Sequence, residues 1–459
     1  MSEQRIKTVN PLTEEVLDTY AYMSDAQATK VVEDCHQAFL DWRLQSLEAR
    51  AEVIRAIGTA LRERKDELAT LMTCETGKLI GDSRDEVDLC AAVCDYSADE
   101  GPKALADEER EVDGATAIVT HAPIGVVYGI QPWNFPAYQA VRYSIASLMA
   151  GNGVLLKHAE NCTGSGLLLR DIYEQAGLPE GLFGVLCITH EQSDTIIEND
   201  LVRGVTMTGS DKAGRHIAAK AGEQVKKTVL ELGSNDAYLV LDDADLDLAV
   251  DTCVQGRLYN NGQTCVNAKR FIVTEKNYDA FVERYAEKFG AIVLGDPTDK
   301  NTQLGPLVSR SQRDQLHEQV IRSVEKGARL VVGGEVPERK GWFYPATVLA
   351  DVAPGQPAYE DELFGPAASI IKAKDDGDAM RIANSSRYGL GGGIFSRDVE
   401  HARELARTYF DTGMVFINTF DIATPNLPFG GVKNSGYGRE HGPEGFKEFV
   451  NIKSIKIAR

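Results

Sequence analysis

IGVVYGIQPWNFPAYQAVRYSIASLMAGNGVLLK, residues 124–157, contains two short apolar runs on either side of a longer segment with helical periodicity. We predict a strand over 124–130, a helix over 137–150 and a second strand over 154–157. A further helix is expected over 164–176. Strands joined by helices pair in parallel, so the pattern favours an α/β fold.

The alternation continues towards the C-terminus. Further strands are expected over 184–188, 202–207, 228–232 and 238–241. Together these runs predict a doubly wound, mostly parallel sheet, which binds nucleotides at the carboxyl ends of its strands. After Leu241 the pattern restarts with a helix over 246–259 and a strand over 270–274. The restart indicates a second α/β domain.

The regions outside these two domains have simpler patterns. Ser24 and Gln27 fit a capping box at the start of an N-terminal helix, and a second helical pattern covers 47–72. Residues 111–121 and 450–457 alternate polar and apolar side chains. We expect these two segments to pair as an outlying β element.

Composition excludes several classes of function. The 459 residues include 69 acidic and 49 basic side chains, which gives a net charge of -20. Nucleic acids and anionic membrane surfaces are therefore not expected partners. Met1–Asn10 has no secretory signal character, and no apolar run approaches the roughly 18 residues of a membrane span, so a cytoplasmic location is predicted.

The commonest enzymatic motifs are absent from the sequence. There is no G-x-G-x-x-G after the early strands, no H-E-x-x-H and no G-x-S-x-G. Gly209–Gly214 has the glycine spacing of a P-loop, but Arg215 and His216 replace its Lys and Ser/Thr. The eight cysteines form no C-x-x-C pair, so most are expected to be buried and no metal site is predicted.

Three residues have the chemistry of an acyl-transfer site. Cys265 follows a glycine turn and is a candidate nucleophile, although a single cysteine is more often structural. Glu231 ends an apolar run, where burial would raise its pKa and suit it to activate water. Asn134 lies between two prolines, in a turn that could direct its amide towards an oxyanion. Glu231 and Asn134 could also simply stabilise their turns.

Five motifs occur together in one order: Pro132–Pro136, Glu231–Gly233, Gly262–Cys265, Glu362–Pro366 and Pro428–Gly436. In this combination the chain resembles the aldehyde dehydrogenase superfamily over nearly its full length. The resemblance implies a Rossmann-like cofactor domain, a second α/β catalytic domain and a β oligomerisation arm. The implied boundaries are 1–105 and 122–231 for the NAD-binding domain, 232–428 for the catalytic domain, and 106–121 and 429–459 for the oligomerisation element.

The resemblance also implies a mechanism. Cys265 would attack an aldehyde, Asn134 and the Cys265 backbone N–H would hold the oxyanion, and Glu231 would activate water to hydrolyse the thioester. A CoA-acylating relative would lack Glu231. A non-catalytic protein on the same fold is a second alternative, against which the intact Cys265, Glu231 and Asn134 argue.

The resemblance further implies contacts to a nicotinamide cofactor. Lys157 and Glu160 match a Lys-x-x-Glu pair that binds the adenosine ribose. A carboxylate at Glu160 would repel a 2′-phosphate, so NAD is expected in preference to NADP. The other implied cofactor residues are Pro132, Trp133, Gly209, Ser210, Leu232, Glu362 and Phe364.

Arg142 bears on the choice of aldehyde. It lies eight residues after Asn134, about two helical turns on, so it would face the substrate. Where relatives oxidise simple aldehydes, an aromatic residue usually occupies this place. A cation suggests a distal carboxylate, as in the short bacterial succinate-semialdehyde dehydrogenases that the chain resembles, although Arg142 could instead form a structural salt bridge. The other expected substrate contacts are Tyr138, Thr264, Thr424 and Phe429.

The substrate and the assembly stay open at this point. Succinate semialdehyde is the first choice, with glutarate semialdehyde or a neutral aldehyde as alternatives, because Tyr259 and Ala423 replace an Arg and a Ser of some related enzymes. A homodimer or homotetramer is expected from the oligomerisation element.

Overall fold

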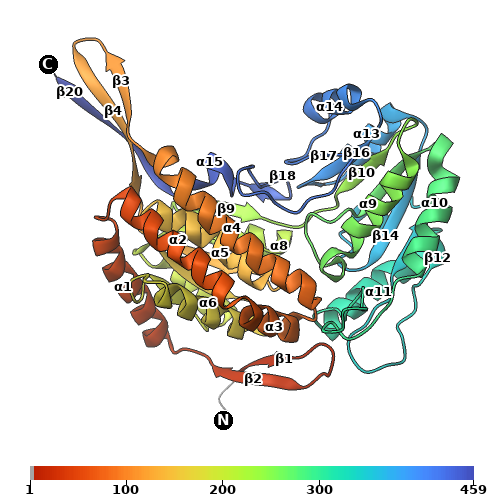
Figure 1. Cartoon of the computed structure of the whole chain (residues 1–459), viewed down its shortest axis with the longest axis horizontal. Helices are drawn as coiled ribbons and strands as arrows, with labels where there is room; N and C mark the ends of the chain where they lie inside the picture. The colour runs from red at the N-terminus through yellow and green to blue at the C-terminus, as the bar shows by residue number, and fades with distance from the viewer. Residues whose placement is uncertain (1–4, 459) are drawn as a thin grey trace.

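The computed structural model describes residues 5–458. Two large sheets, each covered by helices, lie side by side, and a narrow three-stranded arm extends from one end (Figure 1). A small hairpin near the N-terminus, of β1 (Arg5–Val9) and β2 (Val16–Ala21), lies beneath the first layer of helices. The α/β prediction is confirmed.

The first sheet has the strand order β19-β9-β8-β5-β6-β7. Its bounds are β5 (Val126–Gln131), β6 (Gly153–His158), β7 (Phe183–Val185), β8 (Val202–Thr208), β9 (Lys227–Glu231) and β19 (Gly436–Tyr437). All its pairs are parallel except β19 with β9. From β5 the chain adds β6 and β7 on one side of the sheet, and then crosses back to add β8 and β9 on the other side. The direction of winding therefore changes between β5 and β8, which makes this the topological switch point.

Eight α-helices belong to this half of the described chain. They are α1 (Asp25–Trp42), α2 (Leu47–Glu63), α3 (Lys65–Thr76), α4 (Ile80–Leu105), α5 (Pro136–Met149), α6 (Thr163–Gln175), α7 (His190–Glu198) and α8 (Asp211–Glu223). The predicted capping box of Ser24 and Gln27 is present. The single helix predicted over 47–72 is wrong, because Arg64 leaves helical geometry and divides α2 from α3.

The second sheet has the order β12-β13-β14-β11-β10-β16-β17. Its strands are β10 (Ala237–Val240), β11 (Arg270–Thr274), β12 (Arg329–Val332), β13 (Thr347–Ala350), β14 (Ala367–Ala373), β16 (Gly392–Phe395) and β17 (Phe416–Ile417). The strand expected at 238–241 is therefore real, but its assignment to the first sheet is wrong. The five residues 232–236 carry the chain from one sheet to the other.

Helices cover the second sheet as well (Figure 1). They are α9 (Leu246–Leu258), α10 (Glu275–Gly290), α11 (Arg310–Glu325), α12 (Pro357–Glu360), α13 (Asp376–Asn384) and α14 (Val399–Thr408). The remaining short elements are η1 (Glu160–Cys162), η2 (Tyr259–Gly262), β15 (Tyr388–Gly389), β18 (Val432–Lys433) and α15 (Gly442–Phe446).

The arm consists of β3 (Glu108–Val112), β4 (Ala115–Pro123) and β20 (Val450–Ala458). β20 pairs antiparallel with β4 along its whole length, which confirms the expected pairing of 450–457 with residues 115–121; the first residues of the expected segment, 111–112, instead end β3. Ile452, Ile455 and Ile457 are exposed on β20. The arm extends away from the body of the protein (Figure 1), so these exposed isoleucines lie on a projecting strand.

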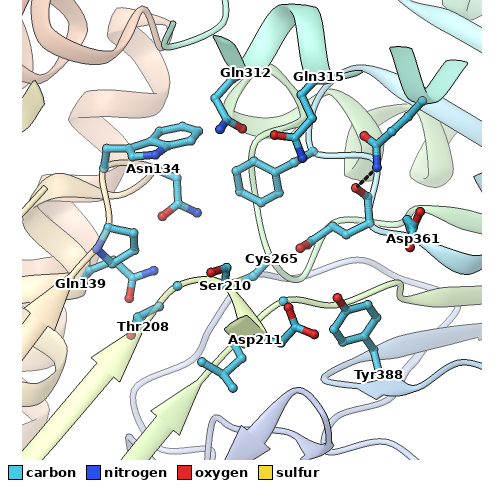
Figure 2. A pocket seen from close by; sticks show the side chains of 18 of the residues that line it. Asn134, Gln139, Thr208, Ser210, Asp211, Cys265, Gln312, Gln315, Asp361 and Tyr388 are labelled. Atoms are coloured by element: carbon cyan, nitrogen blue, oxygen red, sulfur yellow. Dashed lines mark hydrogen bonds between the residues drawn. The ribbon is translucent and has the colours of Figure 1, made fainter. Parts of the chain in front are cut away.

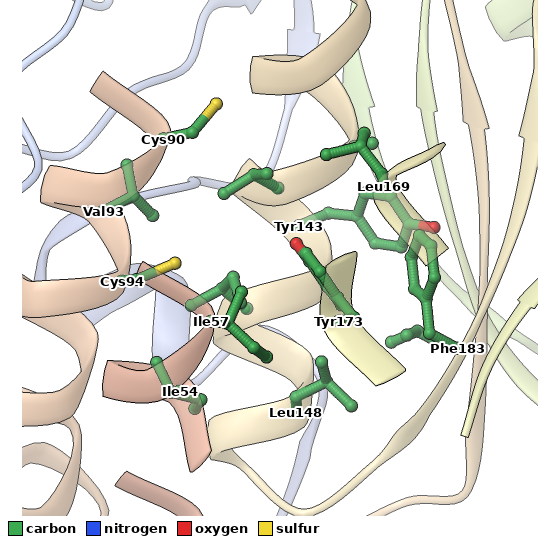
Figure 3. Close-up of a cluster of buried hydrophobic side chains, with 14 of the residues drawn as sticks. Ile54, Ile57, Cys90, Val93, Cys94, Tyr143, Leu148, Leu169, Tyr173 and Phe183 are labelled. Atoms are coloured by element: carbon green, nitrogen blue, oxygen red, sulfur yellow. The ribbon is translucent and has the colours of Figure 1, made fainter. Parts of the chain in front are cut away.

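A large cluster of buried apolar side chains forms the core beside the first sheet. Ile54 and Ile57 of α2 meet Cys90 and Cys94 of α4, with Leu148 of α5 beyond them (Figure 3). Burial raises the pKa of both cysteines, so they act as small apolar side chains. Six of the eight cysteines are buried in this way, as expected.

Candidate active site

A cavity of about 460 Å³ lies between the two sheets, at the switch point beyond β5 and β8. Side chains from both halves of the chain point into it (Figure 2). Its wall includes nine residues that the sequence singled out: Pro132, Trp133, Asn134, Gly209, Ser210, Leu232, Cys265, Glu362 and Phe364. The fold thus brings four of the five sequence motifs to one place.

Asn134 is held in a rigid turn between β5 and α5. Pro136 begins α5, and the backbone oxygen of Asn134 accepts a hydrogen bond from Asn260 Nδ2 at 2.7 Å. The Asn134 amide donates to the Gln263 backbone oxygen at 3.1 Å, and its Oδ1 atom has no hydrogen-bond partner among the described residues. One N–H of the amide therefore stays available to a ligand beside Cys265.

The loop that carries Cys265 is tightly constrained. Asn260 and Asn261 have left-handed backbone angles, with φ of 53° at both, and Gly262 follows with a φ of 75°. A Cβ at residue 262 would collide with the Gly365 backbone. Arg257 donates to the carbonyl oxygens of Gly262 and Leu363, so one buried guanidinium joins the nucleophile loop to the loop that carries Glu362.

Cys265 is only partly buried, unlike most cysteines of the chain. Burial of the sulfur raises its pKa to about 12, while the cations of Lys269 and Arg142 oppose the shift. The resting side chain is therefore a thiol. Its activation depends on nearby positive charge and on what occupies the cavity.

Glu231 is the last residue of β9 and is 2% exposed. Neither carboxylate oxygen has a hydrogen-bond partner among the described residues. Burial raises its pKa well above the usual value, and Arg142 opposes this shift. Glu231 does not itself line the cavity, but Leu232 and Gly233, which follow it, do. Glu231 can act as a base only in its ionised form, so the raised pKa moves this activity to higher pH.

Glu362, Phe364 and Trp133 also line the cavity. The Trp133 and Phe364 rings meet edge to face, with centroids 5.6 Å apart. Glu362 Oε1 lies 3.2 Å from Lys269 Nζ and has no hydrogen-bond partner in the described chain. A Cβ at Gly233 would lie 2.8 Å from Glu362 Oε2, so the glycine leaves room beside this carboxylate.

Lys157 and Glu160 lie at the end of β6, outside the residues that line the main cavity. Lys157 is buried, and burial lowers its pKa. Glu160 Oε1 accepts a hydrogen bond from the Tyr22 hydroxyl at 2.7 Å. Both residues lie near the carboxyl end of β6, the strand next to β5, and so at the same end of the sheet as the cavity.

Arg142 does not line the cavity. It is 1% exposed and forms an ion pair with Glu440, and its Nη2 atom donates to Thr208 Oγ1 at 3.2 Å. The guanidinium carbon lies 5.2 Å from the Tyr138 ring centroid and 4.6 Å from that of Phe429. Its Nη1 atom has no hydrogen-bond partner in the described chain.

The remaining expected substrate residues do not line the cavity either. Phe429 belongs to a small apolar cluster against which Cys265 packs, and the Tyr138 hydroxyl lies 2.6 Å from His441 Nε2. Thr264 is buried and donates to the Tyr259 backbone oxygen at 3.4 Å. The Thr424 hydroxyl donates to Asp421 at 3.0 Å.

Comparison with known proteins gives one consistent result. The sequence matches the aldehyde dehydrogenase family over residues 1–455. It is 43% identical to a succinate-semialdehyde dehydrogenase [NADP(+)] of Deinococcus radiodurans, over 99% of this chain and 95% of that protein. It is 41% identical to a succinate semialdehyde dehydrogenase [NAD(P)+] of Escherichia coli, over 98% of this chain and 97% of that protein.

A solved structure agrees with these matches. Succinic semialdehyde dehydrogenase from Streptococcus pyogenes, in complex with NADP+, superimposes with a TM-score of 0.96 at 40% identity, covering 99% of this chain and 100% of that one. The chain belongs to the aldehyde dehydrogenase family. It is an enzyme that oxidises an aldehyde with a nicotinamide cofactor.

The cavity of this aldehyde dehydrogenase fits such a cofactor. Ser210 caps α8 by accepting from the Ala213 N–H, so a helix N-terminus begins at the cavity wall, where phosphate groups are stabilised. The Glu362 carboxylate, paired on one side with Lys269, keeps lone pairs that can accept hydrogen bonds from ribose hydroxyls. These two features suit the pyrophosphate and the nicotinamide ribose.

The aldehyde dehydrogenase cavity also includes residues that the sequence analysis did not identify. Gln312, Gln315 and Gln319 of α11 form one side of it. Their spacing of three and four places them on one helix face, which was the available signal, but an isolated polar face usually indicates solvent. The other unexpected lining residues are Gln139, Thr208, Asp211, Asp361, Arg387 and Tyr388, and Gly233 of the Glu231–Gly233 motif also lines the cavity.

No helix in residues 5–458 is both long and apolar enough to cross a membrane. Within the same residues, no three His, Cys, Asp or Glu side chains are grouped closely enough to hold a metal ion.

Proposed function

We propose that this aldehyde dehydrogenase oxidises succinate semialdehyde to succinate. The observation that carries the proposal is Arg142 Nη1, a buried guanidinium N–H without a partner in the described chain, close to the cluster in which Cys265 packs. An unsatisfied buried donor of this kind suits an anionic group of a ligand. The names of the relatives from D. radiodurans and E. coli support the same substrate.

The first step is addition of the Cys265 thiolate to the aldehyde carbon, which forms a C–S bond and an oxyanion. In this proposal the free N–H of the Asn134 amide and the Cys265 backbone N–H stabilise that oxyanion. The Arg142 Nη1 atom orients the substrate by donating to its distal carboxylate. Both interactions act in a site from which most water is excluded.

A nicotinamide cofactor held at Ser210 and Glu362 would supply the hydride acceptor, and loss of the hydride from the adduct would leave a thioester on Cys265. Glu231 then takes a proton from water, and the resulting hydroxide attacks the thioester carbon. Cleavage of the C–S bond regenerates the Cys265 thiolate and releases the acid. Overall, one aldehyde, one water and one oxidised cofactor give one carboxylate, one reduced cofactor and two protons.

The choice between NAD and NADP combines two opposing considerations. Glu160 favours NAD, because its carboxylate would repel a 2′-phosphate. The relatives' names instead include NADP(+) and NAD(P)+, and the S. pyogenes enzyme was solved with NADP+. We propose that the enzyme accepts both cofactors and that Glu160, held by Tyr22, reduces its use of NADP without abolishing it.

A panel of aldehydes tests the proposed substrate. Reduced cofactor is followed by absorbance with succinate semialdehyde, glutarate semialdehyde and a neutral aldehyde of similar length. We expect the highest kcat/KM with succinate semialdehyde. A higher value with either of the other two would assign the enzyme to that aldehyde.

A further inference from the structure

Lys269 is a buried lysine beside the loop that carries Cys265, and it has no role in the mechanism proposed for Cys265, Asn134 and Glu231. Lys269 is 1% exposed and lies four residues after Cys265. Its ammonium donates to the Cys265 backbone oxygen and, at 3.0 Å, to the Thr264 backbone oxygen. The cation is therefore fixed against the residue that carries the reactive sulfur.

Two further contacts complete the surroundings of this ammonium. Lys269 Nζ donates to Ser234 Oγ at 2.8 Å and lies 3.2 Å from Glu362 Oε1. Ser234 Oγ in turn donates to the Cys265 backbone oxygen. An ammonium has three N–H donors, and here all three can be occupied by fixed oxygens. Lys269 is consequently not free to donate a proton to a substrate.

We propose that Lys269 is a positioning residue. It favours the thiolate of Cys265 and links the nucleophile loop to Glu362, which lines the cavity. The inference rests on the proposed role of Cys265 as nucleophile. Lys269 would act electrostatically, without contact to the aldehyde or to the reacting sulfur.

The charge balance around Cys265 supports this role. Burial opposes the thiolate most strongly, and the Lys269 cation is the largest influence in the other direction. Arg142 acts in the same direction as Lys269, but Glu440 neutralises much of its charge. The titratable groups that face the sulfur are Lys269, Arg142, Glu362, Glu231 and Tyr138. Asp236 faces Lys269 from the connection between the two sheets.

The test measures the thiolate directly. The rate of alkylation of Cys265 by iodoacetamide is measured from pH 6 to 11, without aldehyde or cofactor, by mass spectrometry of the peptide that contains residue 265. Below the midpoint this rate follows the thiolate fraction and rises about tenfold per pH unit, so the displacement of two curves along the pH axis gives the difference between their midpoints, even where these lie above pH 11. We expect Lys269→Met to raise the midpoint by about one to three pH units, the usual effect of losing a neighbouring opposite charge. Alkylation at pH 8 would then be at least about tenfold slower.

Two variants separate charge from shape. Lys269→Arg keeps the cation and should keep the midpoint close to that of the wild type. Lys226→Met is the matched control, because Lys226 also donates to two backbone carbonyl oxygens, of Ile197 and Asn199, but directly precedes β9, whereas the cavity lies beyond the carboxyl end of that strand. It should leave the midpoint unchanged.

Glu362→Gln provides a test that retains Lys269, should Lys269→Met fail to fold. Removing the carboxylate leaves the ammonium uncompensated, so the midpoint should fall. The proposal is overturned if folded Lys269→Met has the wild-type midpoint, if Lys269→Arg shifts as far as Lys269→Met, or if Glu362→Gln causes no fall. Because no aldehyde is present, an error in the proposed substrate would alter the aldehyde panel and leave this result intact.

Discussion

Arg142 and Glu440 form an ion pair in the protein interior, where the two side chains are 1% and 7% exposed. Breaking a buried pair by removing one partner typically costs about 3–5 kcal/mol, because the other charge is left uncompensated. A single substitution of Arg142 therefore mixes a loss of stability with any loss of substrate binding. The pair has to be changed together for the substrate role to be measured.

The first prediction concerns this pair. In Arg142→Met/Glu440→Gln we expect KM for succinate semialdehyde to rise by about 10- to 150-fold, the equivalent of a charge-assisted hydrogen bond of about 1.5–3 kcal/mol. KM for a neutral four-carbon aldehyde should change little. Glu440→Gln alone is the control. Equal increases for both aldehydes would mean that Arg142 acts only through the structure of the site.

The second prediction concerns the oxyanion. Asn134→Ala should lower kcat by about 10²–10³-fold, the usual effect of losing one oxyanion donor. Gln139→Ala removes another amide from the cavity wall and should have a much smaller effect on kcat. Steady-state kinetics measure both variants. A loss in Gln139→Ala as large as that in Asn134→Ala would contradict the assignment.

The third prediction concerns hydrolysis. Glu231→Gln should release about one reduced cofactor per subunit in a rapid burst and then stall, because the thioester is no longer hydrolysed. Stopped-flow absorbance resolves the burst. Since burial raises the pKa of Glu231, its carboxyl is protonated at low pH and the wild-type steady-state rate should rise with pH through that pKa. A pH-independent hydrolysis step would argue against Glu231 as the base.

The fourth prediction concerns cofactor choice. Glu160→Ser removes the carboxylate that is expected to face the adenosine ribose. The ratio of kcat/KM for NADP to that for NAD should therefore increase by at least about tenfold. Tyr22→Phe keeps the carboxylate but removes its 2.7 Å hydrogen bond, so it shows how far the orientation of Glu160 matters. An unchanged ratio in Glu160→Ser would place the 2′-phosphate elsewhere.

The fifth prediction concerns assembly. We propose that the exposed isoleucines of β20 are covered in a homodimer or homotetramer, since an apolar edge of this kind is rarely left in solvent. Ile452→Lys/Ile455→Lys should reduce the molar mass measured by light scattering to that of a smaller species. Val16→Lys, at an exposed apolar position on the N-terminal hairpin, is the control and should leave the mass unchanged.

Local pattern was sufficient to predict much of the fold. β5, α5 and β6 were located to within one or two residues, because an apolar strand, two prolines and a helical repeat follow one another directly. The break at Arg64 was missed, since no glycine or proline marks it. The sheet that β10 joins was also assigned wrongly, because sheet membership depends on long-range pairing that a strand of four residues does not encode.

The site shows the same division. Cys265, Asn134 and Glu362 belong to motifs whose residues are close in sequence, and the fold brings these motifs to one cavity. Gln312 and Gln315 have no such motif, so only the packing of α11 against the cavity identifies them. The ion pair of Arg142 likewise depends on Glu440, a residue about three hundred positions away in the chain.

The two sheets contribute different parts of the reaction. Asn134 and Glu231 are fixed to the first sheet, whereas Cys265 and Glu362 are fixed to loops of the second. The rate consequently depends on the alignment of two separately folded scaffolds, and displacements of about 1 Å can change a rate by about 10²-fold. Substitutions along the seam between the scaffolds would tune turnover without altering any group that meets the substrate.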